Sequence, residues 1–314
     1  MIELAAIERA RRVTSDVVAP SPLVRLDVDA PCEIWLKLES LQPIGSFKLR
    51  GAASAIRQAG PDAWRDGVWT TSAGNMAQGV CFVARELGVP ATVVAPDHAP
   101  RAKLDAVERL GGRVVLVPFD RWWETMEQGA FEGLGGFFVH PVLDERVMAG
   151  NGVIGLELVE QLGEPDAVYV PWGGGGLATG IASALHSVAP RARVIACEPE
   201  TGAPLAASLA AGQPVAVDYR ASFVDGAGGK ALLPAMWERA RELIPEAIPV
   251  PLDEVAAAVR MLATRARVVA EGAGALALAA ALGHSGRGRV VVIVSGGNID
   301  AARLATILAG SVPT

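Results

Sequence analysis

Short apolar runs alternate with longer helix-like segments along most of the chain. The runs are rich in β-branched residues, show no polar alternation, and cover residues 68–71, 91–96, 113–118, 167–171, 194–197 and 290–294. Strands that are apolar at every position are buried on both faces, as in a parallel sheet covered by helices. The pattern therefore predicts an α/β protein with open, mostly parallel sheets flanked by helices.

Helical periodicity fills much of the chain between these runs. Apolar residues recur with helical spacing in the segments 1–13, 75–87, 101–110, 177–187, 252–266 and 273–282. The stretch between 119 and 166 is less regular. Because strands alternate with helices, we expect parallel strands joined by right-handed crossovers.

Turns that are rich in glycine and polar residues follow several of the predicted strands directly. They occupy residues 72–75, 173–176 and 295–298. In open parallel sheets, ligands bind at the edge where the carboxyl ends of the strands meet. The turns therefore predict one shared binding site at that edge.

The size and composition of the chain indicate a protein with a large core. It has 314 residues, of which 51% are hydrophobic and 20% are charged, and its net charge is −6. This length favours two domains or one elaborated domain. The mild charge and the lack of a basic cluster argue against nucleic acid and anionic membrane surfaces as partners.

Cysteine usage and the apolar segments predict a cytoplasmic protein. Cys32, Cys81 and Cys197 are odd in number and form no CxxC pair, so they indicate neither a zinc site nor a disulfide framework. The N-terminal segment has no apolar signal core. The most apolar helical stretch, 268–282, contains Glu271 and is too short to span a bilayer.

A lysine at the start of an apolar helix is the first candidate for chemistry. Lys48 lies in the sequence Gly-Ser-Phe-Lys-Leu-Arg-Gly of residues 45–51 and follows a glycine turn. Taken alone, such a lysine is ordinarily a solvated surface residue. A lysine that forms a Schiff base must be desolvated or held near cations, so that its neutral amine is populated. Lys48 becomes a candidate Schiff-base lysine only when it is considered together with the glycine-rich turns.

The turn at 72–75 is a candidate site for a carboxylate. Ser72 follows a strand and Asn75 opens a helix. Backbone N–H groups at a helix start lack partners within the helix and attract anions. The gain for an anion there is roughly 0.3–2 kcal/mol. An ordinary helix N-cap explains these residues equally well in isolation.

Four consecutive glycines, Gly173 to Gly176, join a buried strand to a helix. Glycine lets the backbone approach an oxyanion closely, and successive amides then form a cup for a phosphate. The rival interpretation is a dinucleotide-binding turn, because Gly173, Gly175 and Ala178 fit a relaxed fingerprint and Glu198 ends the next strand. Glycine-rich turns satisfy that fingerprint easily, so phosphate binding is the favoured interpretation.

Taken together, the segments around Lys48, the two glycine-rich turns and the turn after 290–294 resemble the fold-type II pyridoxal-phosphate enzymes. The similarity is closest to the threonine/serine dehydratases, or ammonia-lyases, with serine racemases as relatives. It implies a two-domain fold like that of tryptophan synthase β. Residues 1–50 and 144–314 would form a large cofactor-binding domain, and residues 51–143 a small substrate-loop domain. The resemblance also implies a homodimer.

The resemblance assigns roles to individual residues of these segments. Lys48 would hold pyridoxal 5′-phosphate as a Schiff base and, once released, remove the α-proton of the substrate. The glycine turn would hold the phosphate, Asn75 the 3′-oxygen, and Ser295 the ring nitrogen. The implied cofactor-binding residues are Phe47, Lys48, Asn75, Gly173, Gly174, Gly175, Gly176, Leu177 and Ser295. The implied substrate-binding residues are Ser72, Ala73, Gly74, Asn75 and Gln78.

A metal site is not expected. Glu198 matches the first residue of the divalent-metal loop of the relatives, but Pro204 stands at the position of its aspartate. Proline offers no side-chain ligand to a cation.

The implied reaction is β-elimination, in which a β-hydroxy amino acid, first of all L-threonine or L-serine, yields an α-keto acid and ammonia. Serine racemases carry a second acid/base serine where this chain has Ala73. Elimination is therefore favoured over racemisation. Residues 224–230 depart from the usual dehydratase pattern, which leaves a 3-hydroxyaspartate-type ammonia-lyase as an alternative.

An NAD-dependent dehydrogenase is the alternative from another class of enzyme. It would leave Lys48, Asn75 and Ser295 without roles, which disfavours it. Glu271, which precedes a buried apolar helix, is interpreted as a helix-start carboxylate, with a place near the cofactor ring as the alternative.

Overall fold

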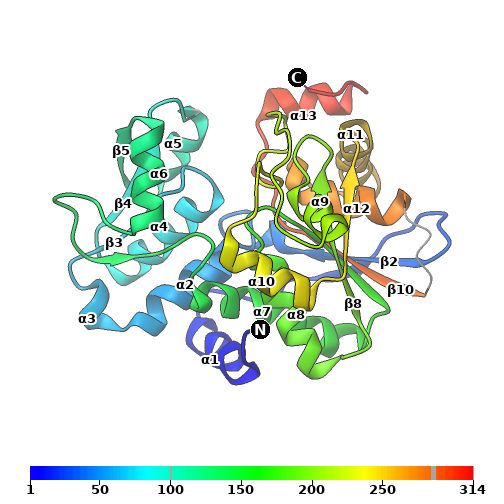
Figure 1. Ribbon diagram of the computed structural model, residues 1–314, viewed down its shortest axis with the longest axis horizontal. Coiled ribbons are helices and arrows are strands. Elements are labelled where there is room, and N and C mark those ends of the chain that lie inside the picture. Colours follow the sequence, from blue (N-terminus) through cyan, green and yellow to red (C-terminus); the bar gives the residue numbers. More distant parts are fainter. Residues whose placement is uncertain (100, 284–287, 314) are drawn as a thin grey trace.

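Two separate sheets organise the molecule. A computed structural model describes residues 1–99, 101–283 and 288–313. Figure 1 shows the smaller sheet and its helices on the left and the larger sheet on the right. Helix α2 (Lys48–Ala59) packs against α4 (Asn75–Leu87) of the smaller unit and against α7 (Glu145–Leu162) of the larger one. The predicted α/β class with sheets flanked by helices is confirmed.

The larger sheet has six strands in the order β1-β2-β10-β7-β8-β9. All neighbours pair in parallel except β1 with β2. The strands are β1 (Leu23–Arg25), β2 (Glu33–Leu38), β7 (Ala167–Pro171), β8 (Arg193–Pro199), β9 (Glu246–Val250) and β10 (Arg289–Val294).

The smaller sheet has four strands in the order β5-β4-β3-β6, all parallel. They are β3 (Val68–Thr70), β4 (Ala91–Pro96), β5 (Arg113–Val117) and β6 (Phe137–Phe138). Helices α4, α5 (Arg101–Arg109) and α6 (Phe119–Gln128) belong to this unit and connect its strands.

The remaining helices surround the larger sheet and the junction, apart from the short helix that follows α2, which lies on the side of the smaller unit (Figure 1). They are α1 (Leu4–Thr14), α3 (Pro61–Trp64), α8 (Gly176–Val188), α9 (Pro204–Ala211), α10 (Pro234–Leu243), α11 (Leu252–Met261), α12 (Gly272–Gly283) and α13 (Ala301–Leu308). Within the described ranges, none of the helices combines the length and apolarity needed to cross a membrane.

The continuous apolar character of the central strands follows from burial on both faces. In β10, Val290, Val292 and Val294 pack in the same core as α11 and α12. The alternating residues Val291 and Ile293 pack in a second core with residues of α7 and α8. Because neighbouring side chains of a strand point to opposite faces, each face needs its own apolar set.

One predicted helix is shorter than expected. The segment 252–266 forms α11 only as far as Met261, and residues Leu262–Ala266 continue as a π-helical turn. Arg267 ends this turn with φ of +61°, the one non-glycine residue in the described chain with positive φ. The apolar stretch 268–282 is also helical only from Gly272 onward, because the segment before it runs past the end of β10.

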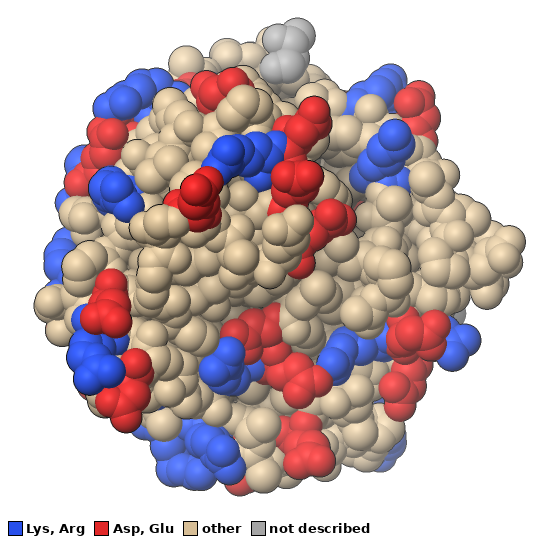
Figure 2. Space-filling model, turned by 60° about the vertical axis from the view of Figure 1, so that its left-hand side comes forward, with Lys and Arg blue, Asp and Glu red and all other residues tan. Residues whose placement is uncertain are grey.

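Charge is distributed without a single-sign patch on the face shown in Figure 2. Lysine and arginine side chains lie interspersed with aspartate and glutamate across that face. Exposed ion pairs of the molecule include Arg101 with Asp105 and Arg193 with Glu246.

Candidate active site

The segment before Lys48 is fastened to the turn after β10 by backbone contacts. The Phe47 amide donates to the Ser295 carbonyl at 3.0 Å, and the Gly297 amide donates to the Gly45 carbonyl at 2.8 Å. Gly45 has φ of +70°, which favours glycine because it lacks a Cβ. The candidate lysine therefore starts α2 directly beside the carboxyl end of the central strand β10.

Lys48 lies where burial of its side chain favours the neutral form of its amine. Its side chain is half-buried, and Nζ lies 5.1 Å from the centre of the Phe47 ring. Burial lowers the pKa of the Lys48 ammonium to about 8, while the nearby Glu271 carboxylate opposes this effect. A lysine with such a pKa provides a substantial neutral fraction near neutral pH, as a Schiff-base lysine requires.

The turn at 72–75 forms a helix start without a side-chain cap. Helix α4 begins at Asn75, and its N-cap residue, Gly74, has no side chain with which to cap the first amides of the helix. The Ser72 hydroxyl accepts from the Gly74 amide at 3.3 Å. Ser72, Ala73, Gly74, Asn75 and Gln78 are all half-buried. The first amides of α4 are thus available to an anion such as a substrate carboxylate.

Two contacts place this turn relative to its surroundings. The Trp122 indole donates to the Thr71 carbonyl at 2.8 Å and so fixes the chain just before Ser72. On α4, Gly79 approaches the start of α2 so closely that a Cβ there would lie 3.2 Å from the Lys48 carbonyl oxygen. The candidate carboxylate site and the candidate lysine therefore belong to two helices in direct contact.

The glycine turn at 173–176 has the shape expected of a phosphate cup. Gly175, with φ of +91°, is the N-cap of α8, and it supplies no side-chain cap. A Cβ on Gly174 would lie 2.5 Å from Val142 Cγ2, and a Cβ on Gly175 would lie 2.5 Å from the Trp172 ring. Only glycine fits both positions, and the uncapped helix start leaves amides for the oxygens of a phosphate.

Asn151 of α7 connects the glycine turn with the lysine helix. Its Nδ2 donates to the Gly176 carbonyl at 3.3 Å. A Cβ on Gly51 of α2 would lie 3.1 Å from Asn151 Oδ1. Loop residue Gly226 lies close on the other side, since its carbonyl oxygen is 3.0 Å from a Cβ placed on Gly173.

Ser295 and Glu271 lie at the carboxyl end of β10. Ser295 is buried, and its hydroxyl donates to the Ala273 carbonyl at 3.4 Å. Glu271 is also buried, and its carboxylate accepts from Asn75 Nδ2 at 2.7 Å. Glu271 was interpreted from the sequence first as a helix-start carboxylate. Glu271 directly precedes α12, as that interpretation expects, and its contact with Asn75 also places it at the candidate site.

The structure removes the support for a dinucleotide site. The Glu198 carboxylate accepts hydrogen bonds from the Leu205 and Ala206 amides at 3.0 and 2.8 Å. It therefore caps α9 instead of facing a ribose. Within residues 1–99, 101–283 and 288–313, no group of three or more histidine, cysteine or acidic side chains is arranged to hold a metal ion.

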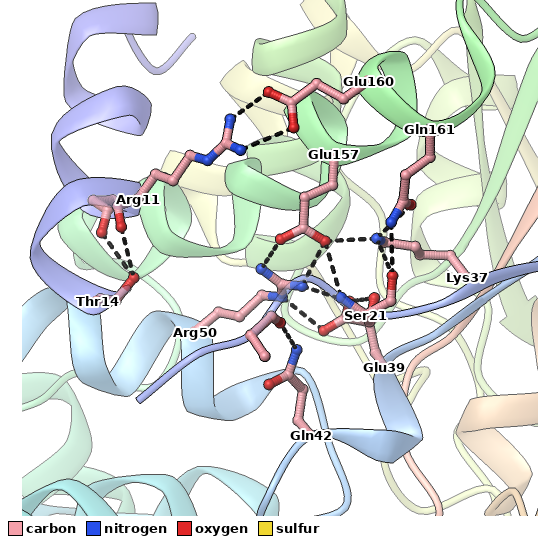
Figure 3. A network of polar contacts seen from close by, with 12 residues as sticks. Arg11, Thr14, Ser21, Lys37, Glu39, Gln42, Arg50, Glu157, Glu160 and Gln161 are labelled. Atoms are coloured by element: carbon pink, nitrogen blue, oxygen red, sulfur yellow. Dashed lines mark hydrogen bonds and ion pairs between the residues drawn. The ribbon is translucent and has the colours of Figure 1, made fainter. Parts of the chain in front are cut away.

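A buried ion cluster holds α2 in place behind the site (Figure 3). Arg50, two residues after Lys48, pairs with Glu39 and with Glu157 of α7, each at 2.7 Å. Lys37 of β2 also pairs with Glu157, at 2.5 Å. The four side chains are almost fully buried, and their charges balance. Figure 3 shows Ser21 reaching into the same cluster, where its hydroxyl donates to Glu39.

Sequence reasoning missed two residues of this arrangement. Asn298 lies in the predicted turn at 295–298 but had no assigned role, and its amide donates to Asn75 Oδ1 at 2.8 Å. Trp122 lies in the irregular stretch after residue 118, where no element was predicted. The pairing of Asn75 with Asn298 joins positions 223 residues apart, so local pattern carries no signal for it.

The fold and the site define a class of protein: an α/β enzyme with a partly desolvated lysine and a glycine-rich turn at an uncapped helix start. Comparison with known proteins identifies the family. The sequence profile described as "Pyridoxal-phosphate dependent enzyme" matches residues 14–296, and the chain belongs to this family. The resemblance to the threonine/serine dehydratases is confirmed as well.

Individual relatives cover almost the whole chain. L-threonine ammonia-lyase of Thermotoga maritima is 39% identical over 308 residues, which are 96% of this chain and 76% of that protein. The catabolic L-threonine dehydratase of Staphylococcus aureus is 35% identical, over 98% of this chain and 92% of the relative. The structure of maize serine racemase superposes with a TM-score of 0.88 at 30% identity, covering 98% of this chain and 97% of that one.

Proposed function

We propose that the chain catalyses the β-elimination of a β-hydroxy amino acid, L-threonine or L-serine, to an α-keto acid and ammonia. The observation that carries the proposal is the Lys48 amine, whose pKa burial lowers to about 8 at the start of a helix packed against the uncapped start of α4. Relatives at 35–39% identity are an L-threonine ammonia-lyase and an L-threonine dehydratase, which supports the substrate class.

The residues present fit pyridoxal phosphate, because the glycine turn leaves room that any Cβ would fill. When bound, the cofactor supplies a conjugated ring that accepts the electron pair released at the α-carbon of the substrate. We assign the covalent attachment to Lys48, the ring nitrogen to Ser295 and the 3′-oxygen to Asn75, with Phe47 as a flanking contact. We assign the phosphate to Gly173, Gly174, Gly175, Gly176 and Leu177.

Lys48 acts as the general base. With the cofactor bound, the free amine of Lys48 would remove the α-proton of the substrate. A base works best when its pKa lies near the operating pH, and burial brings Lys48 to that range. The amides at the start of α4, together with Ser72 and Gln78, hold the substrate carboxylate and so fix the α-carbon relative to Lys48.

Two uncharged side chains direct the outcome toward elimination. Ser295 presents a neutral hydroxyl, so no carboxylate on this chain holds a proton at the ring nitrogen. Ala73 has no hydroxyl with which to return a proton to the opposite face of the α-carbon. Proton return, and with it racemisation, is therefore disfavoured relative to departure of the β-hydroxyl.

We further propose a division into a cofactor domain, residues 1–50 and 144–314, and a substrate-loop domain, residues 51–143. The separate sheets support this division, because β3 to β6 all fall within 51–143. We also propose a homodimer, which the family resemblance supports. A cytoplasmic location is supported by the three cysteines, which are all free thiols.

The test is a panel of β-hydroxy amino acids assayed for release of α-keto acid and ammonia. We expect turnover of L-threonine or L-serine, and we expect Lys48→Ala to abolish both turnover and the visible absorbance of the bound cofactor. Chiral chromatography of the L-serine reaction measures any D-serine. Keto-acid release by Lys48→Ala, or D-serine as the main product of the wild type, would contradict the proposal.

A further inference from the structure

Glu271 contacts the candidate site through Asn75. Its Oε1 accepts from Asn75 Nδ2 at 2.7 Å, and the glutamate is buried. Gly296, in the turn after β10, leaves the room for this contact. A Cβ on Gly296 would overlap the Glu271 carboxylate and lie 3.3 Å from Asn75 Nδ2. The contact is therefore built into the packing of the turn.

The Asn75 amide is held at both ends by partners of opposite polarity. Its Nδ2 donates to Glu271, and its Oδ1 accepts from Asn298 Nδ2 at 2.8 Å. A carboxylate accepts hydrogen bonds, whereas an amide nitrogen donates them. The two partners therefore specify one orientation of the Asn75 amide and disfavour its flipped form.

Asn298 anchors this arrangement to the lysine segment. The same Nδ2 that donates to Asn75 also donates to the Ile44 carbonyl at 2.9 Å. Four segments thus meet: the chain leading to Lys48, the start of α4, the residue before α12, and the turn after β10 that carries Asn298. Asn75 belongs to the smaller unit, and its two partners belong to the larger one.

Glu271 also carries the acidic charge that acts on Lys48. Backbone contacts bring the two residues to the same turn, because the Glu271 amide donates to the Gly296 carbonyl at 3.1 Å and the Phe47 amide donates to the adjacent Ser295 carbonyl at 3.0 Å. Burial lowers the pKa of Lys48, and Glu271 is the group that opposes this effect. Burial raises the pKa of Glu271 to about 7. The hydrogen bond from Asn75 and the charges of Lys103 and Lys48 favour its ionised form, whereas Asp225 disfavours it.

We propose that Glu271 is a positioning residue of this enzyme: its carboxylate orients the Asn75 amide and places a negative charge beside Lys48. The inference rests on the proposed role of Lys48 as the cofactor lysine. Two substitutions separate the two actions. Glu271→Gln keeps an oxygen that accepts from Asn75 but removes the charge, whereas Glu271→Ala removes both.

The first measurement follows the acylation of Lys48 by acetic anhydride in the full chain freed of cofactor. Peptide mass spectrometry gives the rate at Lys48 as a function of pH, since only the neutral amine reacts. We expect a midpoint at about 8 in the wild type. Both Glu271→Gln and Glu271→Ala lower this midpoint, because each removes the negative charge that favours the ammonium form.

Glu198→Gln provides the matched control. Glu198 is likewise buried, and burial likewise raises its pKa to about 7, but its carboxylate caps α9. It does not contribute to the pKa of Lys48. We therefore expect the acylation midpoint of Glu198→Gln to equal that of the wild type. Thermal unfolding of all variants verifies that they are folded.

The second measurement is kcat/KM of the loaded enzyme. We expect Glu271→Ala to lower it roughly 10- to 100-fold, which corresponds to the loss of one hydrogen bond to a charged group. Glu271→Gln recovers most of this loss, because its amide oxygen still accepts from Asn75. The proposal thus predicts that glutamine at position 271 restores turnover but does not restore the acylation midpoint of Lys48. A role of Glu271 in stability alone would affect both measurements together.

The outcomes distinguish this inference from the proposed function. An unshifted Lys48 midpoint in Glu271→Gln, or an equal shift in Glu198→Gln, overturns the charge effect. A glutamine variant as impaired as the alanine variant overturns the orientation of Asn75. If the wild type binds no cofactor at Lys48, the proposed function itself fails. A normal wild-type spectrum combined with either contrary result rejects only the role of Glu271.

Discussion

Burial, more than pairing, sets the ionisation of the acidic residues at the strand ends. No cation contributes to the pKa of Glu198. Burial raises this pKa from 4.5 to about 7, although two backbone amides donate hydrogen bonds to the carboxylate. Between these two pH values the folded protein binds a proton that the unfolded chain releases. Stability from this site is therefore present at low pH and is lost as pH rises through about 7.

The corresponding prediction concerns Glu198→Gln, which cannot ionise. We expect the unfolding free energy of the wild type, relative to this variant, to decrease as pH rises from about 5 to about 8. Urea unfolding of both proteins across this range measures the difference. A difference that stays constant with pH would show that Glu198 keeps its ordinary pKa in the folded state.

At this same scale, the sequence predicts as candidates those residues whose pattern is local. Lys48 after its glycine turn and the glycines at 173–176 carry their signal in neighbouring positions. Asn298 does not, because its importance arises from a contact with Asn75 across the fold. For Glu271, the sequence offered a place near the ring only as the second interpretation, since a carboxylate before a helix also serves as an N-terminal charge.

At the scale of elements, the turn between β7 and α8 depends on glycine for both conformation and space. Gly175 has φ of +91° and lies against the Trp172 ring. We expect Gly175→Ala to weaken cofactor binding at least roughly tenfold, because a displacement of the cup costs about 1.4 kcal/mol or more. Titration of the visible absorbance with pyridoxal phosphate measures the affinity.

Gly212→Ala is the control for the conformational part of this effect. Gly212 also has positive φ, +68°, but a Cβ there meets nothing within 4 Å. We expect it to cost about 1–2 kcal/mol of stability for the left-handed conformation and to leave cofactor affinity unchanged. Equal affinities of the two variants would mean that the glycine turn does not hold the phosphate.

The elements predicted from sequence are those with a single clear period. Strands β4 and β7 and helix α4 have the predicted bounds, because each shows either an unbroken apolar run or a helical spacing. Helix α7 had no prediction. Its residues 147–158 are all buried, and its glycines meet other helices closely, so this part of the helix has no exposed polar face to reveal its period.

The buried ion cluster links α7 to the lysine helix, and it yields a prediction for both. Glu157→Ala leaves Arg50 and Lys37 buried with too little negative charge. We expect a loss of about 3–5 kcal/mol in unfolding free energy. Glu160→Ala, on the same helix, breaks the exposed pair with Arg11 and should cost at most about 1 kcal/mol. Chemical unfolding compares the two variants. Similar losses of unfolding free energy would show that the buried cluster stabilises the protein no more than an exposed ion pair does.

At the scale of the whole molecule, an ion pair bridges the two units. Lys103 of α5, in the smaller unit, pairs with Asp225 at 2.7 Å, and Arg303 of α13 lies 3.7 Å from the same carboxylate. Asp225 precedes Gly226, whose carbonyl lies against Gly173 of the glycine turn. The ion pair therefore ties the loop beside the candidate cofactor site to the opposite unit.

The pair is about one-third exposed, so its effect on stability is expected to be small, about 0–1 kcal/mol. Its effect on function is expected to come from holding the two units together over the substrate.

We expect Asp225→Ala and Lys103→Ala each to raise KM a few-fold at low ionic strength with little change in melting temperature. The double variant should add nothing further. Because exposed charges are screened within about 8–10 Å at moderate salt, the difference from the wild type should shrink as salt is added. Measuring KM of the wild type and the variants at two salt concentrations tests this prediction. If the KM increases of the two single variants add up in the double variant, or do not change with salt, the loop is positioned by packing alone and the ion pair has no effect on function.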